Sequence, residues 1–311
     1  MSDEMPQFQD MHQFMDWLGK KLGRALVNPP PLPEYVRPKD PQVIVLMPVH
    51  NISKYWPQVS GSLYRLDPQP SLYVFAENNS TDDTLKLVSQ FDRPKEILRF
   101  WFRDDAIDFC ETWTDIIGIV RQFLLQRARK LDPDFAIFLD SDISVTSTDL
   151  IDRLTRWGDS CIVGGPYRLA HGPTPALVMS LHNLEFKWVR KSGLEEVFLL
   201  AGGCVCLPRK AIQDRRLKFY PVRCDRYKGL EFFAAAREAA FVKIGLTSWY
   251  LPEDEAFAWR AFIYGYRLFV DWSIYLDHLS WNEPKTTRWR LPDGYRDPLR
   301  EELFRRITAH W

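Results

Sequence analysis

The sequence lacks the glycine-rich loops with which many proteins bind nucleotide phosphates. Neither Gly-x-Gly-x-x-Gly nor Gly-x-x-x-x-Gly-Lys-Ser/Thr occurs in its 311 residues, so the usual backbone cradles for phosphate are excluded. If the chain binds a nucleotide, another group must meet the phosphate charge. A divalent cation held by carboxylates is the obvious alternative, because such cations prefer oxygen ligands and bridge diphosphate oxygens readily.

An excess of charge of one sign is also missing, since Lys+Arg and Asp+Glu both number 41. A general nucleic-acid-binding protein normally shows a basic excess, so we expect no nucleic-acid partner. No run reaches the roughly 18 apolar residues of a membrane span. The acidic first residues do not have the basic-then-apolar order of a signal peptide. We therefore expect a cytoplasmic protein.

Cysteine is scarce, and its spacing fits no disulfide framework. The five cysteines are Cys110, Cys161, Cys204, Cys206 and Cys224. The Cys-Val-Cys of 204–206 has no fourth ligand at zinc-type spacing. Buried, reduced thiols are therefore expected, and they suit a reducing compartment.

The two ends of the chain differ in character from its middle. Residues 11–27 carry apolar residues at helical spacing with basic residues between them. Such an amphipathic helix could lie on a membrane surface as a peripheral contact, or pack on its own domain or a partner subunit. Residues 28–41 are too rich in proline for a helix or a central strand and predict a linker. We expect the main domain at 42–281 and a basic tail at 282–311, read as a solvated face.

Strand-like and helix-like segments alternate in the first half of the main domain. The apolar runs at 42–49, 71–78, 97–102 and 135–140 predict strands, and the segments between them predict helices. This alternation indicates an α/β fold with a mostly parallel central sheet and helices on both faces. Ligands of such sheets bind at the carboxyl ends of the strands.

The second half is less regular. Residues 161–168 predict a strand and turn, and 199–212 predict a strand, a glycine turn and a helix start. Residues 252–265 begin with proline, carry acids in the first turn and end in glycine, which predicts a helix. A further strand is predicted at 266–271, just before His278.

Three predicted strands end in polar residues, at 48–51, 77–79 and 140–142. In a parallel sheet these ends share one edge. The Asp-Ser-Asp of 140–142 could hold a cation, which would remove the repulsion between its carboxylates. Alternatively, the first acid ends the strand and Asp142 or Ser144 caps a following helix.

Two further groups are open to a structural or a functional interpretation. The acids of 253–255 could simply complement a helix dipole. One of them, facing a cleft, could instead act as a general base. His278 could be a core histidine or a metal ligand.

Taken in order, these motifs resemble those of the nucleotide-sugar glycosyltransferases of the GT-A fold, closest to the family-2-like group. The motifs are Pro48-Val-His-Asn51, Glu77-Asn-Asn-Ser-Thr-Asp-Asp-Thr84, Asp140-Ser-Asp142, Glu253-Asp254, Gly265-Tyr-Arg267 and His278. Each motif is weak alone, but their common order is specific. The resemblance covers residues 42–280. It implies a nucleotide-binding half at 42–145 and an acceptor half at 146–281.

The resemblance also implies roles for individual residues. Asp142 would be the direct ligand of Mn²⁺ or Mg²⁺, His278 would complete the metal site, and Asp140 would contact the ribose or the metal. Asp254 would be the catalytic base, with Glu253 as the neighbouring candidate. The residues expected to bind the nucleotide sugar are Pro48, His50, Asn51, Glu77, Asn78, Arg121, Asp140, Ser141, Gly202 and Gly203.

Within this set, Glu77 would read the base or ribose, although its Glu-Asn-Asn-Ser differs from the usual Asp-Asp-Gly-Ser. Arg121 would help to hold the nucleotide or diphosphate. The pair Gly202-Gly203 would shape the pocket for the acceptor and the donor sugar.

The implied reaction moves a sugar from a UDP- or GDP-linked donor to a hydroxyl acceptor such as a glycan, with inversion preferred. The motif at 77–84 also resembles fungal mannan-type mannosyltransferases, so a retaining enzyme is one alternative. A catalytically inactive carbohydrate-binding protein of the same fold is another. A sugar nucleotidyltransferase is disfavoured, because it would need a glycine-rich basic loop where this chain has His-Asn-Ile-Ser at 50–53.

Overall fold

A computed structural model gives the fold of much of the chain. The described residues are 31–34, 39–102, 113–159, 161–167, 179–180, 193–220, 222–223, 250–251, 253–274 and 276–279. The expected helix at 11–27 and the basic tail at 282–311 lie outside these ranges. Within them, no helix combines the length and the apolar character that crossing a membrane requires.

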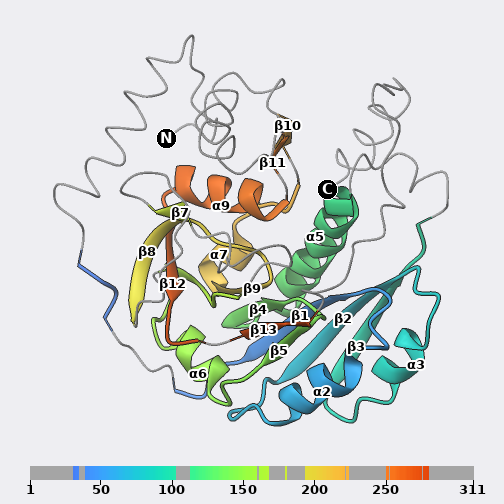
Figure 1. The fold of residues 1–311 in the computed structure, drawn as a ribbon. Coiled ribbons are helices and arrows are strands. Elements are labelled where there is room, and N and C mark those ends of the chain that lie inside the picture. Colours follow the sequence, from blue (N-terminus) through green and yellow to red (C-terminus); the bar gives the residue numbers. More distant parts are fainter. Residues whose placement is uncertain are drawn as a thin grey trace.

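A nine-stranded sheet runs through the molecule in the order β3-β2-β1-β4-β9-β6-β12-β8-β7 (Figure 1). Its strands are β1 (Val43–Val49), β2 (Leu72–Asn78), β3 (Lys95–Phe100), β4 (Phe135–Leu139), β6 (Cys161–Gly164), β7 (Met179–Ser180), β8 (Leu194–Leu199), β9 (Cys204–Pro208) and β12 (Arg267–Asp271). β3, β2, β1 and β4 pair in parallel, as do β6 and β12. β9 runs against both of its neighbours, and so does β8. The prediction of a mostly parallel sheet is therefore confirmed, with β9 and β8 as the reversed strands.

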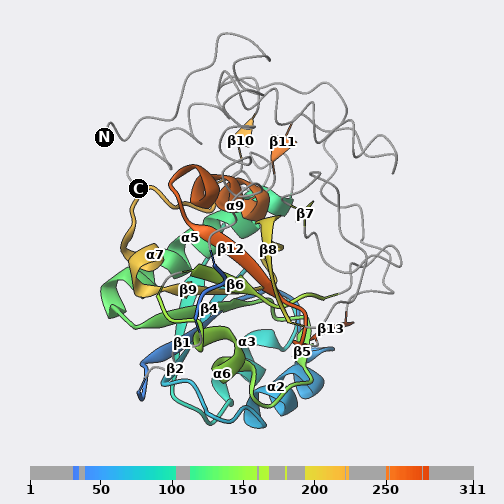
Figure 2. The ribbon, with the colours of Figure 1, turned by 90° about the vertical axis from the view of Figure 1, so that its left-hand side faces the viewer.

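Helices cover both faces of the sheet, as predicted (Figures 1 and 2). One face carries α2 (Trp56–Tyr64), α3 (Thr84–Ser89) and α6 (Leu150–Thr155), and the other carries α5 (Trp113–Leu131), α7 (Arg209–Gln213) and α9 (Glu253–Ile263). Every residue of β1 and of β4 is buried. Continuous apolar runs such as theirs are typical of central strands that are covered on both faces.

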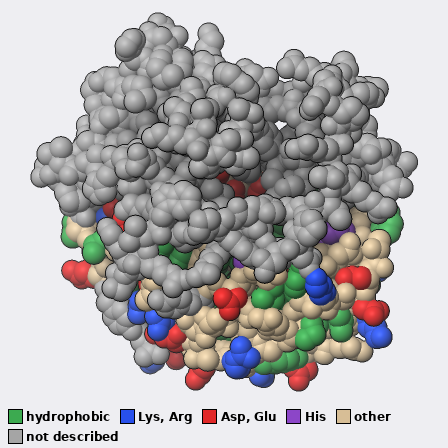
Figure 3. Space-filling view, viewed as in Figure 1, with side chains coloured by type: hydrophobic (Ala, Val, Ile, Leu, Met, Phe, Trp, Pro, Cys, Tyr) green, Lys and Arg blue, Asp and Glu red, His purple; other side chains and the backbone are tan. Residues whose placement is uncertain are grey.

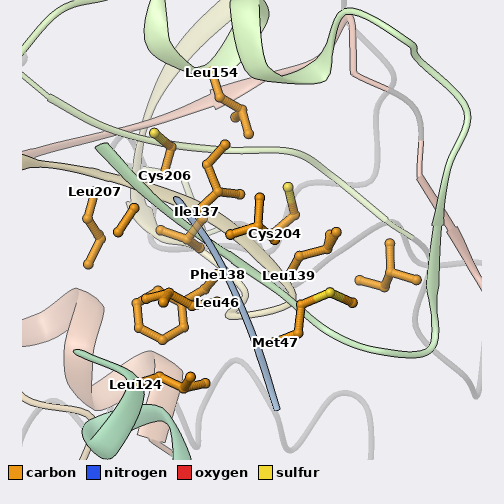
Figure 4. Close-up of a cluster of buried hydrophobic side chains, with 14 of the residues drawn as sticks. Leu46, Met47, Leu124, Ile137, Phe138, Leu139, Leu154, Cys204, Cys206 and Leu207 are labelled. Atoms are coloured by element: carbon orange, nitrogen blue, oxygen red, sulfur yellow. The ribbon is translucent and has the colours of Figure 1, made fainter. Parts of the chain in front are cut away.

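The core is built around β1, β4 and β9 (Figure 4). Leu124 of α5 and Leu154 of α6 pack toward these strands from two helices. Cys161, Cys204 and Cys206 are free and buried, which confirms the expectation of reduced thiols for these three residues. Cys110 and Cys224 lie outside the described residues.

Two smaller sheets complete the described fold. β5 (Ile143–Val145) pairs antiparallel with β13 (Leu276–His278), and β10 (Val222–Arg223) pairs with β11 (Tyr250–Leu251). β5 decides one open question, because a strand and not a helix follows the Asp-Ser-Asp segment. The alternative that Asp142 or Ser144 caps a helix is therefore wrong. The next helix, α6, has Asp149 as its N-cap residue.

Charged side chains of both signs are interspersed over the described surface seen in Figure 3. This distribution agrees with the equal numbers of acidic and basic residues in the sequence.

An aromatic cluster fixes α2 and the segment after α3 to the sheet. The ring of Phe91 meets the rings of Trp56, Tyr73 and Phe75 edge-on, with centroid distances of 5.6, 5.1 and 5.8 Å. Phe91 is 2% exposed. Edge-to-face pairs of this kind add to the stabilisation that comes from burial.

We expect Phe91→Ala to lower the free energy of unfolding by about 3–5 kcal/mol, because it leaves a cavity among three rings. Urea denaturation measures this change. Trp101→Ala is the control, since Trp101 is 73% exposed, and its effect should stay within about 0.5 kcal/mol. Equal losses in the two variants would contradict this account of the core.

Candidate active site

The pairing of β13 with β5 brings His278 next to the Asp-Ser-Asp segment. His278 lies opposite Ile143 in the antiparallel register. The backbone N–H of Leu279 donates to the carbonyl oxygen of Asp142 over 2.8 Å. His278 Nε2 and Asp142 Oδ2 are 3.6 Å apart. Two of the three residues expected at a metal site, Asp142 and His278, are therefore neighbours, although they are far apart in the sequence.

The donor set fits a divalent cation that the protein holds only in part. Among the described residues, no group of three or more His, Cys, Asp or Glu side chains is placed to hold a metal ion. Asp142 and His278 could at most supply two ligands, and substrate phosphates or waters would have to supply the others. A cation held by so few protein groups keeps waters and binds substrate phosphates, as Mg²⁺ commonly does beside one or two carboxylates.

Asp140 has a different partner, the buried guanidinium of Arg121. Arg121 comes from α5, and its side chain is 3% exposed. Its Nη2 donates to Asp140 Oδ1 over 2.6 Å, and its Nη1 donates to Glu253 Oε1 over 2.6 Å. Arg121 therefore joins the end of β4 to the start of α9. This pairing could not be predicted from the sequence, because the two partners lie 19 and 132 residues away along the chain.

Glu253 holds a proton more readily than an ordinary glutamate does. Burial raises its pKa well above the ordinary value, the neighbouring Asp254 carboxylate raises the pKa further, and Arg121 opposes both effects. Glu253 Oε2 is buried and has no hydrogen-bond partner among the described residues. A protonated carboxyl would avoid adding another buried negative charge where the single guanidinium of Arg121 already faces several acids.

Asp254 is fixed by backbone amides at the start of α9. Its Oδ2 accepts a hydrogen bond from the N–H of Gly202 over 3.0 Å, and its Oδ1 accepts one from the N–H of Glu255 over 2.8 Å. Asp254 is half-buried. A carboxylate held in this way is suited to accept a proton from a hydroxyl brought to it.

The turn at Gly202-Gly203 touches every part of this acidic group. A Cβ atom on Gly202 would lie 2.2 Å from Arg121 Nη1 and 2.9 Å from Asp254 Cβ. The Arg121 guanidinium cannot easily move aside, since two carboxylates hold it. The carbonyl oxygen of Gly203 accepts a hydrogen bond from the N–H of Asp140 over 2.9 Å. The two glycines therefore allow β9 to pass directly against the acids.

Tyr167, just after β6, belongs to the site but was not found in the sequence analysis. Its hydroxyl oxygen accepts a hydrogen bond from the N–H of Gly203 over 3.0 Å. Its ring is stacked on that of His278, with a centroid distance of 5.6 Å. Burial raises the pKa of Tyr167 well above its ordinary value, and the carboxylates of Asp140 and Asp254 raise it further. The phenol is therefore neutral. A tyrosine after a short strand carries no sequence signal for such a role.

The ends of β1 and β2 form a second group of polar residues. His50 Nδ1 donates to the carbonyl oxygen of Asn78 over 2.6 Å. Asn51 has a left-handed backbone, with φ of 49°, and its Oδ1 accepts a hydrogen bond from the N–H of Thr81 over 2.8 Å. Pro48 is buried within β1 and is paired with Ala76 of β2. The structure thus brings together the residues predicted at these two strand ends.

Glu77 is buried at the end of β2, and the protein itself contacts both of its oxygens. Oε1 accepts a hydrogen bond from the N–H of Ser80 over 2.9 Å, and Oε2 lies 3.3 Å from Nε of Arg99. The carboxylate therefore stabilises the turn that follows β2. Its expected contact with a base or ribose stays a prediction.

Ser141 and Tyr55 are two further polar residues near Asp142. Ser141 is 8% exposed and lies between the two acids of the Asp-Ser-Asp segment. Tyr55 follows the turn after β1. Burial raises its pKa, and the carboxylate of Asp142 raises it further, so the phenol lies within electrostatic range of that acid. Its hydroxyl is buried and has no hydrogen-bond partner among the described residues. Sequence reasoning missed Tyr55 as well.

Comparison with solved structures decides the fold. GalNAc-T7 with UDP, GalNAc and Mn²⁺ matches with a TM-score of 0.50 and 13% identity, over 87% of this chain and 49% of that chain. The chain has a GT-A fold. No family model matches the sequence, and no curated protein matches it.

Two other solved structures are similar to this GT-A chain. S. aureus TarS 1-349 in complex with UDP-GlcNAc has a TM-score of 0.48 and 18% identity, over 86% of this chain and 66% of that chain. The mannosyltransferase PcManGT from Pyrobaculum calidifontis, in complex with GDP-Man and Mn²⁺, has a TM-score of 0.48 and 13% identity, over 96% and 73%. The chain spans between 35% and 66% of the length of the TarS chains that it matches.

The pKa of Glu253 leads to a testable dependence of stability on pH. The folded chain keeps a proton on Glu253 that the unfolded chain loses as the pH rises through the ordinary value of 4.5. The free energy of unfolding should therefore fall as the pH rises from that value toward the raised pKa of the folded state. Glu253→Gln has no proton to lose, so this part of the slope should disappear.

Urea midpoints between about pH 5 and pH 8 measure this slope. Glu96→Gln is the matched control, because Glu96 is partly exposed and pairs with Arg127 away from the site. Its slope should equal that of the unchanged protein. An unaltered slope in Glu253→Gln would contradict the assignment of a retained proton to Glu253.

Proposed function

We propose that this chain is a glycosyltransferase that moves a sugar from a UDP- or GDP-linked donor to a hydroxyl acceptor such as a glycan. The observation that carries the proposal is the distance of 3.6 Å between Asp142 and His278, which come from two distant parts of the sequence. The GT-A fold supports it, and so does the presence of UDP, GalNAc and Mn²⁺ in the GalNAc-T7 structure of the same fold.

In this proposal Asp142 and His278 hold Mn²⁺ or Mg²⁺. When bound, the cation neutralises the charge that develops on the leaving diphosphate. Asp140 stays with Arg121 and orients the segment that carries Asp142. Its predicted contact with the ribose remains part of the proposal. Because the chain has no glycine-rich phosphate loop, the cation held by these two residues would balance the charge of the diphosphate.

Asp254 is proposed as the general base of an inverting transfer. Its carboxylate takes the proton of the acceptor hydroxyl while the hydroxyl oxygen attacks the anomeric carbon. A new C–O bond forms, and the bond from the anomeric carbon to the diphosphate oxygen breaks with its electron pair on the diphosphate. The two backbone hydrogen bonds on Asp254 support this role, because they fix the carboxylate before the acceptor arrives. Glu253 is less suited, since Arg121 already holds it in the interior.

The donor nucleotide is proposed to lie over the ends of β1 and β2. His50, Asn51 and Asn78 are held there by hydrogen bonds between the two strand ends. Tyr55 adds a buried hydroxyl between this edge and Asp142. Gly202 and Gly203 are proposed to border the sugar, because they lie against Asp140 and Asp254.

The metal part of the proposal is tested with a panel of UDP- and GDP-sugars with and without Mn²⁺, by thermal shift and donor hydrolysis. We expect at least one donor to raise the melting temperature only when Mn²⁺ is present. Asp142→Asn should lose this shift, because it removes the charged ligand. Asp277→Asn is the matched control: Asp277 is exposed and lies beside His278 on β13, and it should behave like the unchanged chain. No response to any donor would count against the function.

Asp254→Asn should keep donor binding within about threefold and lose transfer by about 10²–10⁴-fold, the usual contribution of a general base. Asparagine has nearly the same shape but cannot take the proton. The transfer rate is measured for each variant, and NMR determines the anomeric configuration of the product. Glu253→Gln is the comparison and should keep most of its activity. If only Glu253→Gln lost transfer activity, Glu253 and not Asp254 would be the base. If the product retained the anomeric configuration of the donor, the inverting mechanism would be wrong.

A further inference from the structure

Tyr167 is the described residue that touches both the proposed metal ligand and the glycine turn. Its ring is stacked on the ring of His278, with 22° between the planes and 5.6 Å between the centroids. Offset aromatic pairs at such distances have a preferred relative geometry. One face of the imidazole is therefore packed against the ring of Tyr167.

The other end of Tyr167 supports the backbone of the Gly202-Gly203 turn. Its hydroxyl accepts a hydrogen bond from the N–H of Gly203 over 3.0 Å. A Cβ atom on Gly203 would lie 2.6 Å from Tyr167 Cζ, so the turn and the phenol approach each other as closely as a glycine allows. The carbonyl oxygen of the same glycine accepts the hydrogen bond from Asp140. Because Gly203 is hydrogen-bonded to both residues, a displacement of the phenol would also displace the backbone of Asp140.

We propose that Tyr167 is a positioning residue that sets the plane of His278 for cation binding and fixes the glycine turn that supports Asp140 and Asp254. This inference rests on the proposed function, because it assigns to His278 the task of binding the cation. The two ends of Tyr167 have separate tasks: the ring acts on His278, and the hydroxyl acts on Gly203.

The separation of the two ends allows each to be removed alone. Tyr167→Phe keeps the ring and removes the hydroxyl, which leaves the buried N–H of Gly203 without its acceptor. Tyr167→Leu removes both. Tyr167→Met, of similar volume and without a ring, replaces the leucine variant if that variant does not fold.

The first measurement needs no metal. The ring protons of His278 should show an upfield ring-current shift in the NMR spectrum of selectively labelled protein, assigned with His278→Gln. The shift should persist in Tyr167→Phe and disappear in Tyr167→Leu. A His278 signal that is the same in all three proteins would overturn the stacked arrangement.

The second measurement is Mn²⁺ affinity in the presence of UDP or GDP, by electron paramagnetic resonance of the free ion. Tyr167→Leu should bind Mn²⁺ about tenfold more weakly, as expected when a group that orients a ligand is lost. The Mn²⁺ affinity of Tyr167→Phe should stay within about twofold of that of the unchanged chain. Its kcat for donor hydrolysis or transfer should fall about tenfold or more with little change in donor KM, because a small displacement near reacting groups slows the reaction.

The outcomes separate this inference from the function on which it rests. If the unchanged chain binds Mn²⁺ and Tyr167→Leu binds it equally well, Tyr167 is only a core residue and the inference is overturned. The same holds if Tyr167→Phe keeps its kcat. If the unchanged chain does not bind Mn²⁺ with either nucleotide, the proposed function fails, whatever the NMR signal of His278 shows.

Discussion

One buried guanidinium organises the acidic centre of this chain. Arg121 is almost completely buried and donates hydrogen bonds to Asp140 at the end of β4 and to Glu253 at the start of α9. Burying a charge is costly unless partners compensate it, and removing one partner of such a pair leaves the other uncompensated. The end of β4 and the start of α9 are therefore held at a fixed distance from each other. Asp142 and Asp254 follow these two points in the chain, so their separation is restricted as well.

The close approach of β9 follows from this arrangement. The acids and the guanidinium occupy the space in which a side chain at position 202 would lie, and the phenol of Tyr167 occupies the space at position 203. Only glycine can supply the two backbone N–H groups that bind Asp254 and Tyr167 at these positions. Glycine is thus required at 202 and 203 because neighbouring side chains fill the space around these positions.

Much of the sheet could be predicted from the sequence, because its information is local. β1, β2 and β4 are largely apolar and buried, and the limits of the first four strands were predicted within a few residues. β5 and β13 could not be predicted in the same way. Each has three residues, and each becomes a strand only because the other lies beside it. Local sequence cannot reveal a pairing between such distant segments.

The same distinction between local and long-range information applies to the residues of the site. Asp140, Asp142, Asp254 and His278 could be found because they follow strands or begin a helix, where polar residues are conspicuous. Arg121 was found through the resemblance, but its pairing with two acids was not. Tyr167 and Tyr55 were missed, because a tyrosine in an apolar context looks like any core residue. Their importance depends on the three-dimensional position of a hydroxyl, which no periodicity encodes.

The proposed reaction requires a defined distance between the base and the leaving group. Here both sides are held by backbone hydrogen bonds: Asp254 by the N–H groups of Gly202 and Glu255, and Asp142 by the pairing of β5 with β13. The β1 and β2 ends, in contrast, are joined by hydrogen bonds between partly exposed polar groups. Such bonds can be rearranged at a lower cost than a buried ion pair. In the proposed reaction, the geometry of transfer would therefore be rigid, and the choice of nucleotide would fall to the more adaptable strand ends.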